Sequence, residues 1–206
     1  MNIPQPGILL PVPNQARYLS FSLGDPSLIR QGLHMLRELV DGEYTVVGLG
    51  QTLVSALDAT IPGLKSFPMI TAPGLAIENA PEVLWIWLRG EERGEILLRS
   101  QRLARALAPA FQLKEIWDAF KYAEGRDLSG YEDGTENPTG DEATSAAIVG
   151  TGNQTLAGSS FVATQRWLHN FDSLTSMSEN EQDNCIGRRL ADNEEMDDAP
   201  ESAHVK

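Results

Sequence analysis

One loop in the sequence places an acidic side chain between two glycines, in the segment Gly130-Tyr131-Glu132-Asp133-Gly134. Glycine permits backbone conformations with positive φ and lets the chain approach a flat or bulky ligand closely. An aspartate on such a loop can be presented into a cavity and can pass a proton to or from a substrate there. The same pattern is also typical of a surface turn in which the aspartate only caps backbone amides. Asp133 is therefore a candidate acid–base group.

The other reactive side chains define no site by themselves. The sequence has three histidines, His34, His169 and His204, and each is typical of a packing, turn or surface position. The one cysteine, Cys185, excludes an intramolecular disulfide and a cysteine-cluster metal site. It is more typical of a small buried group than of a nucleophile.

Two binding motifs match only in part. The segment Gly48–Leu53 begins like a dinucleotide fingerprint, but Leu53 replaces its third glycine. The segment that begins at Asp133 resembles a calcium loop, but Pro138 and Thr144 stand where such a loop needs glycine and a bidentate acid. A tight turn and a loop without calcium are the better interpretations.

The composition is that of an acidic globular protein. The 206 residues include 16 Lys+Arg and 29 Asp+Glu, which gives a net charge of −13, and 41% are hydrophobic. Such a charge disfavours nucleic acids and anionic membranes as partners. No apolar run approaches the roughly 20 residues of a membrane-spanning helix, and no secretory signal is visible at the N-terminus. We expect a cytoplasmic protein of one or two domains.

The elements that must position Asp133 follow from hydrophobic periodicity. We expect helices from Pro26 to Val40 and from Glu91 to Ala108, and a long connection over residues 61–80. Strands are expected at Ala16–Leu23, Tyr44–Gly48, Glu82–Leu88 and Phe111–Tyr122. This order predicts an α+β fold for residues 1–122: a ferredoxin-like module, with an antiparallel sheet and helices on one face.

The second half of the chain has a different character. Residues 123–143 are rich in Gly, Asp, Glu, Asn and Pro, which predicts a loop that carries the candidate site. For residues 144–206 we expect strands at Ala146–Val149 and Ser160–Trp167, then two short helices. The second helix is expected to begin at a capping box, Ser178–Glu181. This arrangement predicts a second, incomplete ferredoxin-like module.

Several motifs, in order, resemble the dye-decolourising peroxidases, which are haem enzymes built from two ferredoxin-like modules. The five-residue pattern Gly130-x-x-Asp133-Gly134 is that family's GxxDG motif. The match to the family extends through Thr135–Pro138, Gln165–His169, Ile186–Arg188, Asn193–Glu195 and Glu201–His204. The opening segments Gln5–Leu9 and Ala16–Leu19 also resemble the bacterial, cytoplasmic branch of the family.

The resemblance implies a role for five residues. Asp133 matches the family's distal aspartate, and His204 matches the proximal histidine that ligates the iron of haem b (iron protoporphyrin IX). Arg188 matches an arginine near the haem propionates, and Gly134 and Thr135 match positions close to the porphyrin edge. The resemblance thus gives His204 a function that its own surroundings in the sequence do not suggest.

The implied activity is a peroxidase that reduces hydrogen peroxide and oxidises dyes or phenolic compounds, with a small-molecule reductant and as a homo-oligomer. Asp133 would move a proton between the peroxide oxygens. An aspartate in this role predicts an acidic activity optimum, because free aspartic acid titrates at about pH 3.9. Exposed aromatic side chains could pass electrons from large substrates, or could simply pack; the candidates are Trp117, Tyr122, Tyr131 and Trp167.

The sequence departs from the family's pattern after His204. Members of the family continue with more strands and helices, including a distal arginine and an acidic partner of the proximal histidine, and neither has a counterpart here. Losing a preorganised donor can cost about 10²–10³ in rate. We therefore expect residues 1–206 alone to bind haem weakly and to turn over slowly unless a partner completes the module.

A second interpretation remains open. The chain could be a haem-free or haem-carrying ferredoxin-like module that binds a partner or dimerises and has no peroxidase activity. Added hemin would separate the two, because an absorption band that depends on His204 indicates ligation of the iron.

Overall fold

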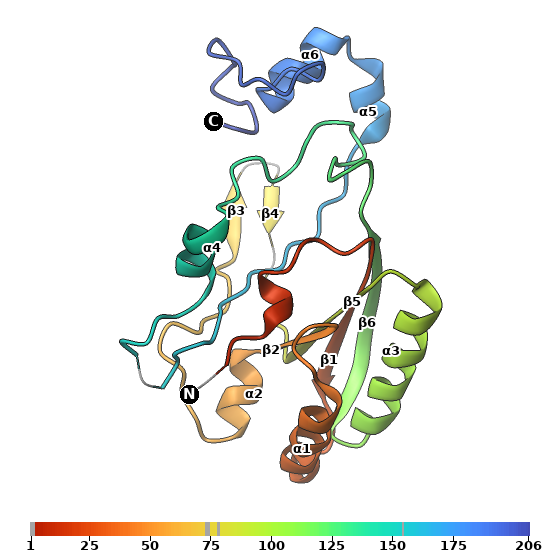
Figure 1. Cartoon of the computed structure of the whole chain (residues 1–206), viewed down its shortest axis with the longest axis vertical. Coiled ribbons are helices and arrows are strands. Elements are labelled where there is room, and N and C mark those ends of the chain that lie inside the picture. Colours follow the sequence, from red (N-terminus) through yellow and green to blue (C-terminus); the bar gives the residue numbers. More distant parts are fainter. Residues whose placement is uncertain (1–2, 73–74, 78, 154) are drawn as a thin grey trace. The chain divides into compact units, whose positions relative to one another are not determined.

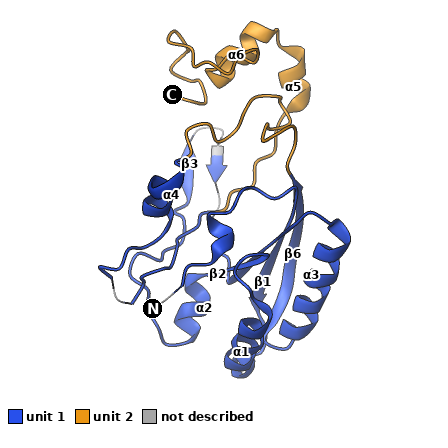
Figure 2. Ribbon diagram, in the orientation of Figure 1, with its two compact units in different colours: residues 1–120, 138–163 blue, residues 121–137, 164–206 orange. Residues whose placement is uncertain are grey.

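The computed structural model describes residues 3–72, 75–77, 79–153 and 155–206. The chain forms two compact units (Figure 2). Unit 1 contains Met1–Phe120 and Pro138–Ala163, and unit 2 contains Lys121–Asn137 and Thr164–Lys206. Each unit is described by itself below.

Unit 1 is organised around a four-stranded antiparallel sheet (Figure 1). Its strands lie in the order β2-β5-β1-β6. The strands are β1 (Gln15–Leu23), β2 (Thr45–Leu49), β5 (Leu84–Gly90) and β6 (Phe111–Phe120), and the two long helices are α1 (Ile29–Leu39) and α3 (Arg93–Leu107). Their sequence order is that of the β-α-β-β-α-β ferredoxin-like motif. The α+β fold predicted for this half, with its antiparallel sheet, is confirmed.

The core of unit 1 lies between the helices and one face of the sheet. Successive side chains of a strand point to opposite faces, so Leu19 and Phe21 of β1 share a face with Ile86 of β5, which pairs with Leu19. These side chains form one buried cluster with Leu36 of α1 and Leu103 of α3. Burial of this apolar face holds the helices on the sheet.

The remaining elements of unit 1 are short. They are the 3-10 helices η1 (Pro6–Ile8) and η2 (Pro26–Leu28), the helices α2 (Gln51–Ala56) and α4 (Gly140–Ala147), and a two-stranded hairpin of β3 (Ile70–Ala72) and β4 (Leu75–Ile77). The hairpin lies inside the predicted long connection, where prolines hid the strand signal. Three residues of that connection, Pro73, Gly74 and Glu78, lie outside the described residues.

Two predicted strands are wrong. Residues 146 and 147 end helix α4, because alanine favours a helix and Asp141 and Glu142 stabilise its first turn. The segment Ser160–Trp167 forms no strand, although its β-branched and aromatic residues favour one. Strand propensity is realised only where a neighbouring strand completes the ladder.

Unit 2 contains two short helices, α5 (Phe171–Ser176) and α6 (Glu179–Ile186). The predicted capping box is confirmed: the Ser178 side chain accepts a hydrogen bond from the Glu181 amide, and the Glu181 carboxylate accepts one from the Ser178 amide at 2.8 Å. Across the described part of unit 2, only isolated bridges join extended residues. A second ferredoxin-like module therefore stays a prediction.

The helices of this chain do not resemble membrane spans. Among the described residues, none of them combines the length and the apolar character that crossing a bilayer requires.

Candidate active site

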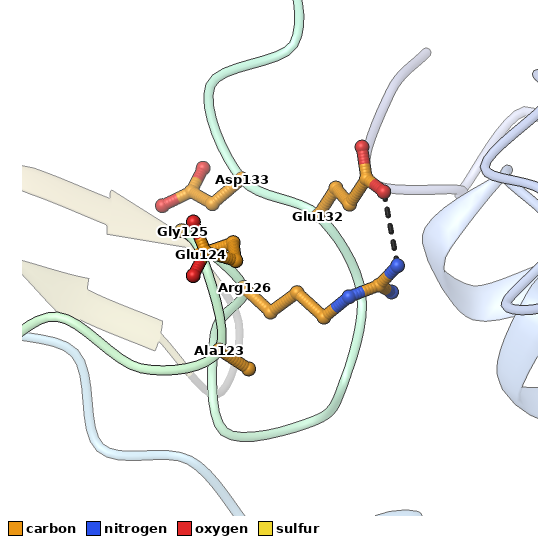
Figure 3. A pocket seen from close by; sticks show the side chains of 6 residues that line it. All are labelled: Ala123, Glu124, Gly125, Arg126, Glu132 and Asp133. Atoms are coloured by element: carbon orange, nitrogen blue, oxygen red, sulfur yellow. Dashed lines mark hydrogen bonds and ion pairs between the residues drawn. The ribbon is translucent and has the colours of Figure 1, made fainter.

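The loop that carries Asp133 folds back on itself at the start of unit 2. Isolated bridges join Arg126 to both Tyr122 and Glu132, and the Asp133 amide donates a hydrogen bond to the Gly125 carbonyl oxygen at 3.3 Å. The loop lines a cavity of about 370 Å³ that is open to solvent (Figure 3). Its lining is Ala123, Glu124, Gly125, Arg126, Glu132 and Asp133.

Inside this lining, one ion pair is already made and one carboxylate is available. The Arg126 guanidinium donates to Glu132 Oε1 at 3.0 Å and to the Gly130 carbonyl oxygen at 2.7 Å. Figure 3 shows the Arg126 side chain extending toward Glu132, while the Asp133 side chain lies near Glu124. Within the described ranges, the exposed Asp133 carboxylate takes part in no side-chain hydrogen bond. It is free to exchange a proton with a small molecule in the cavity.

The glycines beside Asp133 have the backbone conformations that the sequence predicts. Gly130 has φ +96° and Gly134 has φ +73°. A Cβ at Gly134 would also lie 2.5 Å from the amide nitrogen of the Asn137 side chain. Thr135, the other predicted porphyrin contact, is exposed in the turn that follows. The Asn137 side chain could move aside, so the loop needs glycine at position 134 for its backbone conformation.

Arg188 lies after α6 and reaches the same loop. Its side chain is only 11% exposed, and its Nη2 lies 2.9 Å from Glu136 Oε1 and 3.6 Å from Glu195 Oε2. Its Nη1 donates to the Asn193 carbonyl oxygen at 3.0 Å. A guanidinium with two carboxylates on one nitrogen is a site for anionic oxygens. Arg188 thus contacts the loop of Asp133 through Glu136.

His204 rests on the end of helix α6. Its backbone amide donates to the Cys185 carbonyl oxygen at 2.9 Å, and the Val205 amide donates to the Ile186 carbonyl oxygen at 3.2 Å. A Cβ at Gly187 would collide with the Val205 side chain, so the segment comes close to this glycine. The imidazole itself is exposed and makes no hydrogen bond or ion pair with the described residues.

These residues fit an iron porphyrin chemically. The His204 imidazole is exposed and has no hydrogen-bond or ion-pair partner among the described residues, so it is available as an iron ligand. A partly buried arginine suits the carboxylates of a porphyrin. The cavity beside Asp133 is not lined by His204 or Arg188, as far as the described residues show. The structure joins Arg188 to the loop of Asp133, while the roles of all five residues stay predictions.

Sequence reasoning missed one contact in this unit. The Tyr131 hydroxyl donates to Asp183 Oδ1 at 2.5 Å, and both residues are buried. Burial, reinforced by this carboxylate, raises the pKa of Tyr131 well above its usual value. The sequence predicts Tyr131 only as a packing or relay residue, and no sequence motif marks Asp183. Of the other relay candidates, Trp117, Tyr122 and Trp167 are exposed.

Solved structures of DyP-type proteins share this fold over almost the whole chain. A DyP-type peroxidase of Shewanella oneidensis matches 100% of this chain and 72% of its own, with a TM-score of 0.84 at 24% identity. A DypB variant of Rhodococcus jostii, solved in complex with heme, matches 96% of this chain and 69% of its own with a TM-score of 0.78 at 24% identity. The fold is that of the DyP-type peroxidases.

Sequence comparison leads to the same class. Residues 124–206, which include all five candidate residues, match the family model described as Dyp-type peroxidase, C-terminal. A dye-decolorizing peroxidase of Rhodococcus erythropolis is 32% identical over an alignment 222 residues long, which covers 98% of this chain. One of Mycolicibacterium paratuberculosis is 35% identical over 144 residues, or 69% of this chain. The chain belongs to the DyP-type peroxidase family, as its motifs predicted.

The chain is shorter than these relatives. It spans 64% of the Rhodococcus erythropolis protein and 41% of the Mycolicibacterium paratuberculosis protein. The activity, substrates and partners of a whole enzyme are therefore proposals for this chain.

Proposed function

We propose that this chain is the part of a haem peroxidase that contains the distal acid–base group and the proximal iron ligand. The enzyme reduces hydrogen peroxide and oxidises dyes or phenolic compounds. The observation that carries the proposal is the 32% identity to a dye-decolorizing peroxidase over 98% of the chain. The imidazole of His204 and the carboxylate of Asp133, both in unit 2, support it, because neither makes a side-chain hydrogen bond or ion pair with the residues that the structure describes.

The residues that would hold haem b are those that fit it. A ring nitrogen of His204 would bind the iron, and Arg188 would bind a propionate in exchange for part of its contact with Glu136 or Glu195. Gly134 and Thr135 would lie at the porphyrin edge, where the absence of a Cβ at position 134 allows close approach. The bound group would supply the redox chemistry, since it accepts electrons from the reductant after peroxide is reduced.

Asp133 would supply the proton transfer. Its carboxylate would take a proton from one oxygen of hydrogen peroxide and deliver it to the other, which then leaves as water. General acid–base assistance of this kind typically contributes about 10²–10⁴-fold in rate. The position of Asp133 on an open cavity, without a competing side-chain hydrogen bond in the described chain, supports this role.

We further propose that residues 144–206 are part of a second ferredoxin-like module, preceded by an active-site loop at residues 123–143. The segment Ser160–Trp167 supports this, because its strand-forming residues form no strand within this chain. Its Phe161, Val162 and Trp167 side chains are exposed. A partner polypeptide or a second copy that adds strands would cover them. A cytoplasmic location and a homo-oligomer stay predictions.

Hemin titration of the 206-residue chain tests the proposed function. We expect a Soret band that is lost in His204→Ala and kept in His34→Ala, a matched change at a histidine of unit 1. Peroxide-dependent dye bleaching should be fastest at acidic pH and should fall at least about 10²-fold in Asp133→Ala. Because residues 1–206 alone are expected to bind haem weakly, hemin is added in excess. A wild-type chain without any Soret band under these conditions contradicts the proposal and favours the binding module. Bleaching that Asp133→Ala leaves unchanged removes Asp133 from the mechanism.

A further inference from the structure

Two neighbours of Asp133, Tyr131 and Glu132, attach its loop to helix α6 and to the turn after this helix. The Tyr131 hydroxyl donates to Asp183, and the Asn193 side-chain amide donates to Glu132 Oε2 at 3.0 Å. Asp133 itself makes no such side-chain contact among the described residues. Its position is therefore set by its neighbours.

Of these contacts, the one between Tyr131 and Asp183 is buried. Tyr131 is 3% exposed and Asp183 is 9% exposed, whereas Glu132 and Asn193 are more accessible to water. A hydrogen bond to an ionised group is stronger than a neutral one. A buried donor or acceptor that loses its partner also costs more than an exposed one. Of these two contacts, the one between Tyr131 and Asp183 is thus the stronger constraint on the loop.

Asp183 joins this loop to the turn that follows α6. Its Oδ1 accepts both the Tyr131 hydroxyl and the Leu190 amide, at 2.5 and 3.0 Å. Its backbone carbonyl accepts the Gly187 amide at 2.6 Å, which closes the helix at a residue with φ +90°. One residue therefore ends the helix, fixes the turn after Arg188 and anchors the loop of Asp133.

The same helix end supports His204. The carbonyl oxygens of Cys185 and Ile186, two and three residues after Asp183, accept the amides of His204 and Val205. The candidate distal acid and the candidate proximal ligand are thus both attached to the segment Asp183–Gly187, one through a side-chain hydrogen bond and the other through backbone hydrogen bonds.

We propose that Asp183 is a positioning residue of the peroxidase site, which acts through the Tyr131 hydroxyl to hold Asp133 in place relative to the helix end that carries His204. This inference rests on the proposed function, and it names the residue that fixes the spacing of the two candidate groups. Asp183 contacts neither peroxide nor porphyrin in this role. Its effect passes through Tyr131 to the backbone of the loop.

The test uses Tyr131→Phe, Asp183→Ala and Asp183→Asn in the 206-residue chain. Tyr131→Phe keeps the ring and removes only the hydroxyl. Asp183→Asn keeps an oxygen that can accept both hydrogen bonds, so it is the conservative rescue. Tyr44→Phe is the matched control, because Tyr44 is an exposed tyrosine of unit 1.

The first measurement is amide hydrogen exchange of residues 130–136 in the haem-free chain. We expect exchange about tenfold faster in Tyr131→Phe and Asp183→Ala, as the loss of one hydrogen bond implies. Asp183→Asn should change it less, and Tyr44→Phe should not change it. The urea midpoint of the sheet in unit 1 should be the same in all variants. Exchange at the wild-type rate in Tyr131→Phe would overturn the inference, whether or not the chain binds hemin.

The second measurement uses the hemin-loaded chain. In Asp183→Ala, which keeps the Tyr131 side chain named above as a relay candidate, we expect kcat for peroxide-dependent bleaching to fall about tenfold, while the KM for the dye and the affinity for hemin stay unchanged. Faster loop exchange together with an unchanged kcat would show that Asp183 only stabilises the loop, and the positioning role would be wrong. A wild-type chain that gives no Soret band dependent on His204 contradicts the proposed function instead, and it leaves the exchange result intact.

Discussion

The two units are stabilised by different forces. In unit 1 most of the buried side chains are apolar and come from the sheet and helices, among them Leu19, Ile86, Leu103 and Phe111, although polar side chains such as Arg17 and Arg89 are buried there too. In unit 2 the buried side chains are few, and one of them is the carboxylate of Asp183. Its described residues are connected mainly by hydrogen bonds and ion pairs, as at Arg188.

This difference matters for function. Apolar burial is strong but not directional, so it fixes a sheet and its helices without fixing any single atom. Hydrogen bonds contribute less to stability but depend on the positions of particular atoms. The candidate site lies in unit 2, where individual polar contacts fix the positions of the side chains. We expect mutations in unit 1 to change global stability and those in unit 2 to change local geometry.

The largest expected effect is in unit 1. Phe111→Ala removes a fully buried ring from the start of β6. Truncations of this kind cost about 3–5 kcal/mol, because they lose apolar burial and leave a cavity. Urea unfolding followed by circular dichroism should show a large decrease in the midpoint. A decrease in the free energy of unfolding of less than about 1 kcal/mol would contradict the assignment of Phe111 to the core.

A glycine substitution in unit 2 should have a smaller and local effect. Gly187→Ala places a Cβ against Val205 at a residue with φ +90°, which costs about 1–3 kcal/mol. We expect faster exchange of the His204 and Val205 amides and weaker hemin binding. In the matched control Gly94→Ala, in helix α3, the new Cβ meets no described atom within 4 Å, so stability should be kept or slightly raised. Equal effects of the two substitutions would contradict the close packing at Gly187.

The smallest expected effect is the pH dependence of an ion pair in unit 1. Arg17 Nε and Nη2 donate to the two carboxylate oxygens of Asp118 at 2.6 and 2.8 Å, and this hydrogen bonding lowers the pKa of Asp118. A carboxyl group with a lowered pKa in the folded state stabilises the protein above its ordinary pKa, and this contribution disappears as pH falls through the lowered value.

The variant Asp118→Asn tests this pair. Its stability relative to the wild type should be lower at neutral pH, and the difference should shrink as the pH falls below about 4. Urea midpoints of both proteins between neutral and acidic pH would measure it. A difference that stays constant over this range would show that the ion pair does not contribute through its charge.

Much of unit 1 could be predicted from the sequence, because its signals are local and agree with one another. Partly alternating apolar residues mark β1, a continuous apolar run marks β5, and Pro109 ends the helix before β6. The wrong predictions fall where a local signal competes with its surroundings. Ala146 favours a helix over a strand, and Phe161 lies in a strand-like segment that forms no strand in this chain.

The candidate site divides in the same way. The sequence by itself determined the loop of Asp133, the capping box at Ser178 and the positive φ of Gly134, because glycines and capping side chains act within a few residues of chain. Only the tertiary structure decided that Tyr131 meets Asp183, 52 residues away, and that Arg188 meets Glu136 at the same separation. A buried hydroxyl and a carboxylate can have many partners along a chain, and folding selects one by bringing both out of water together.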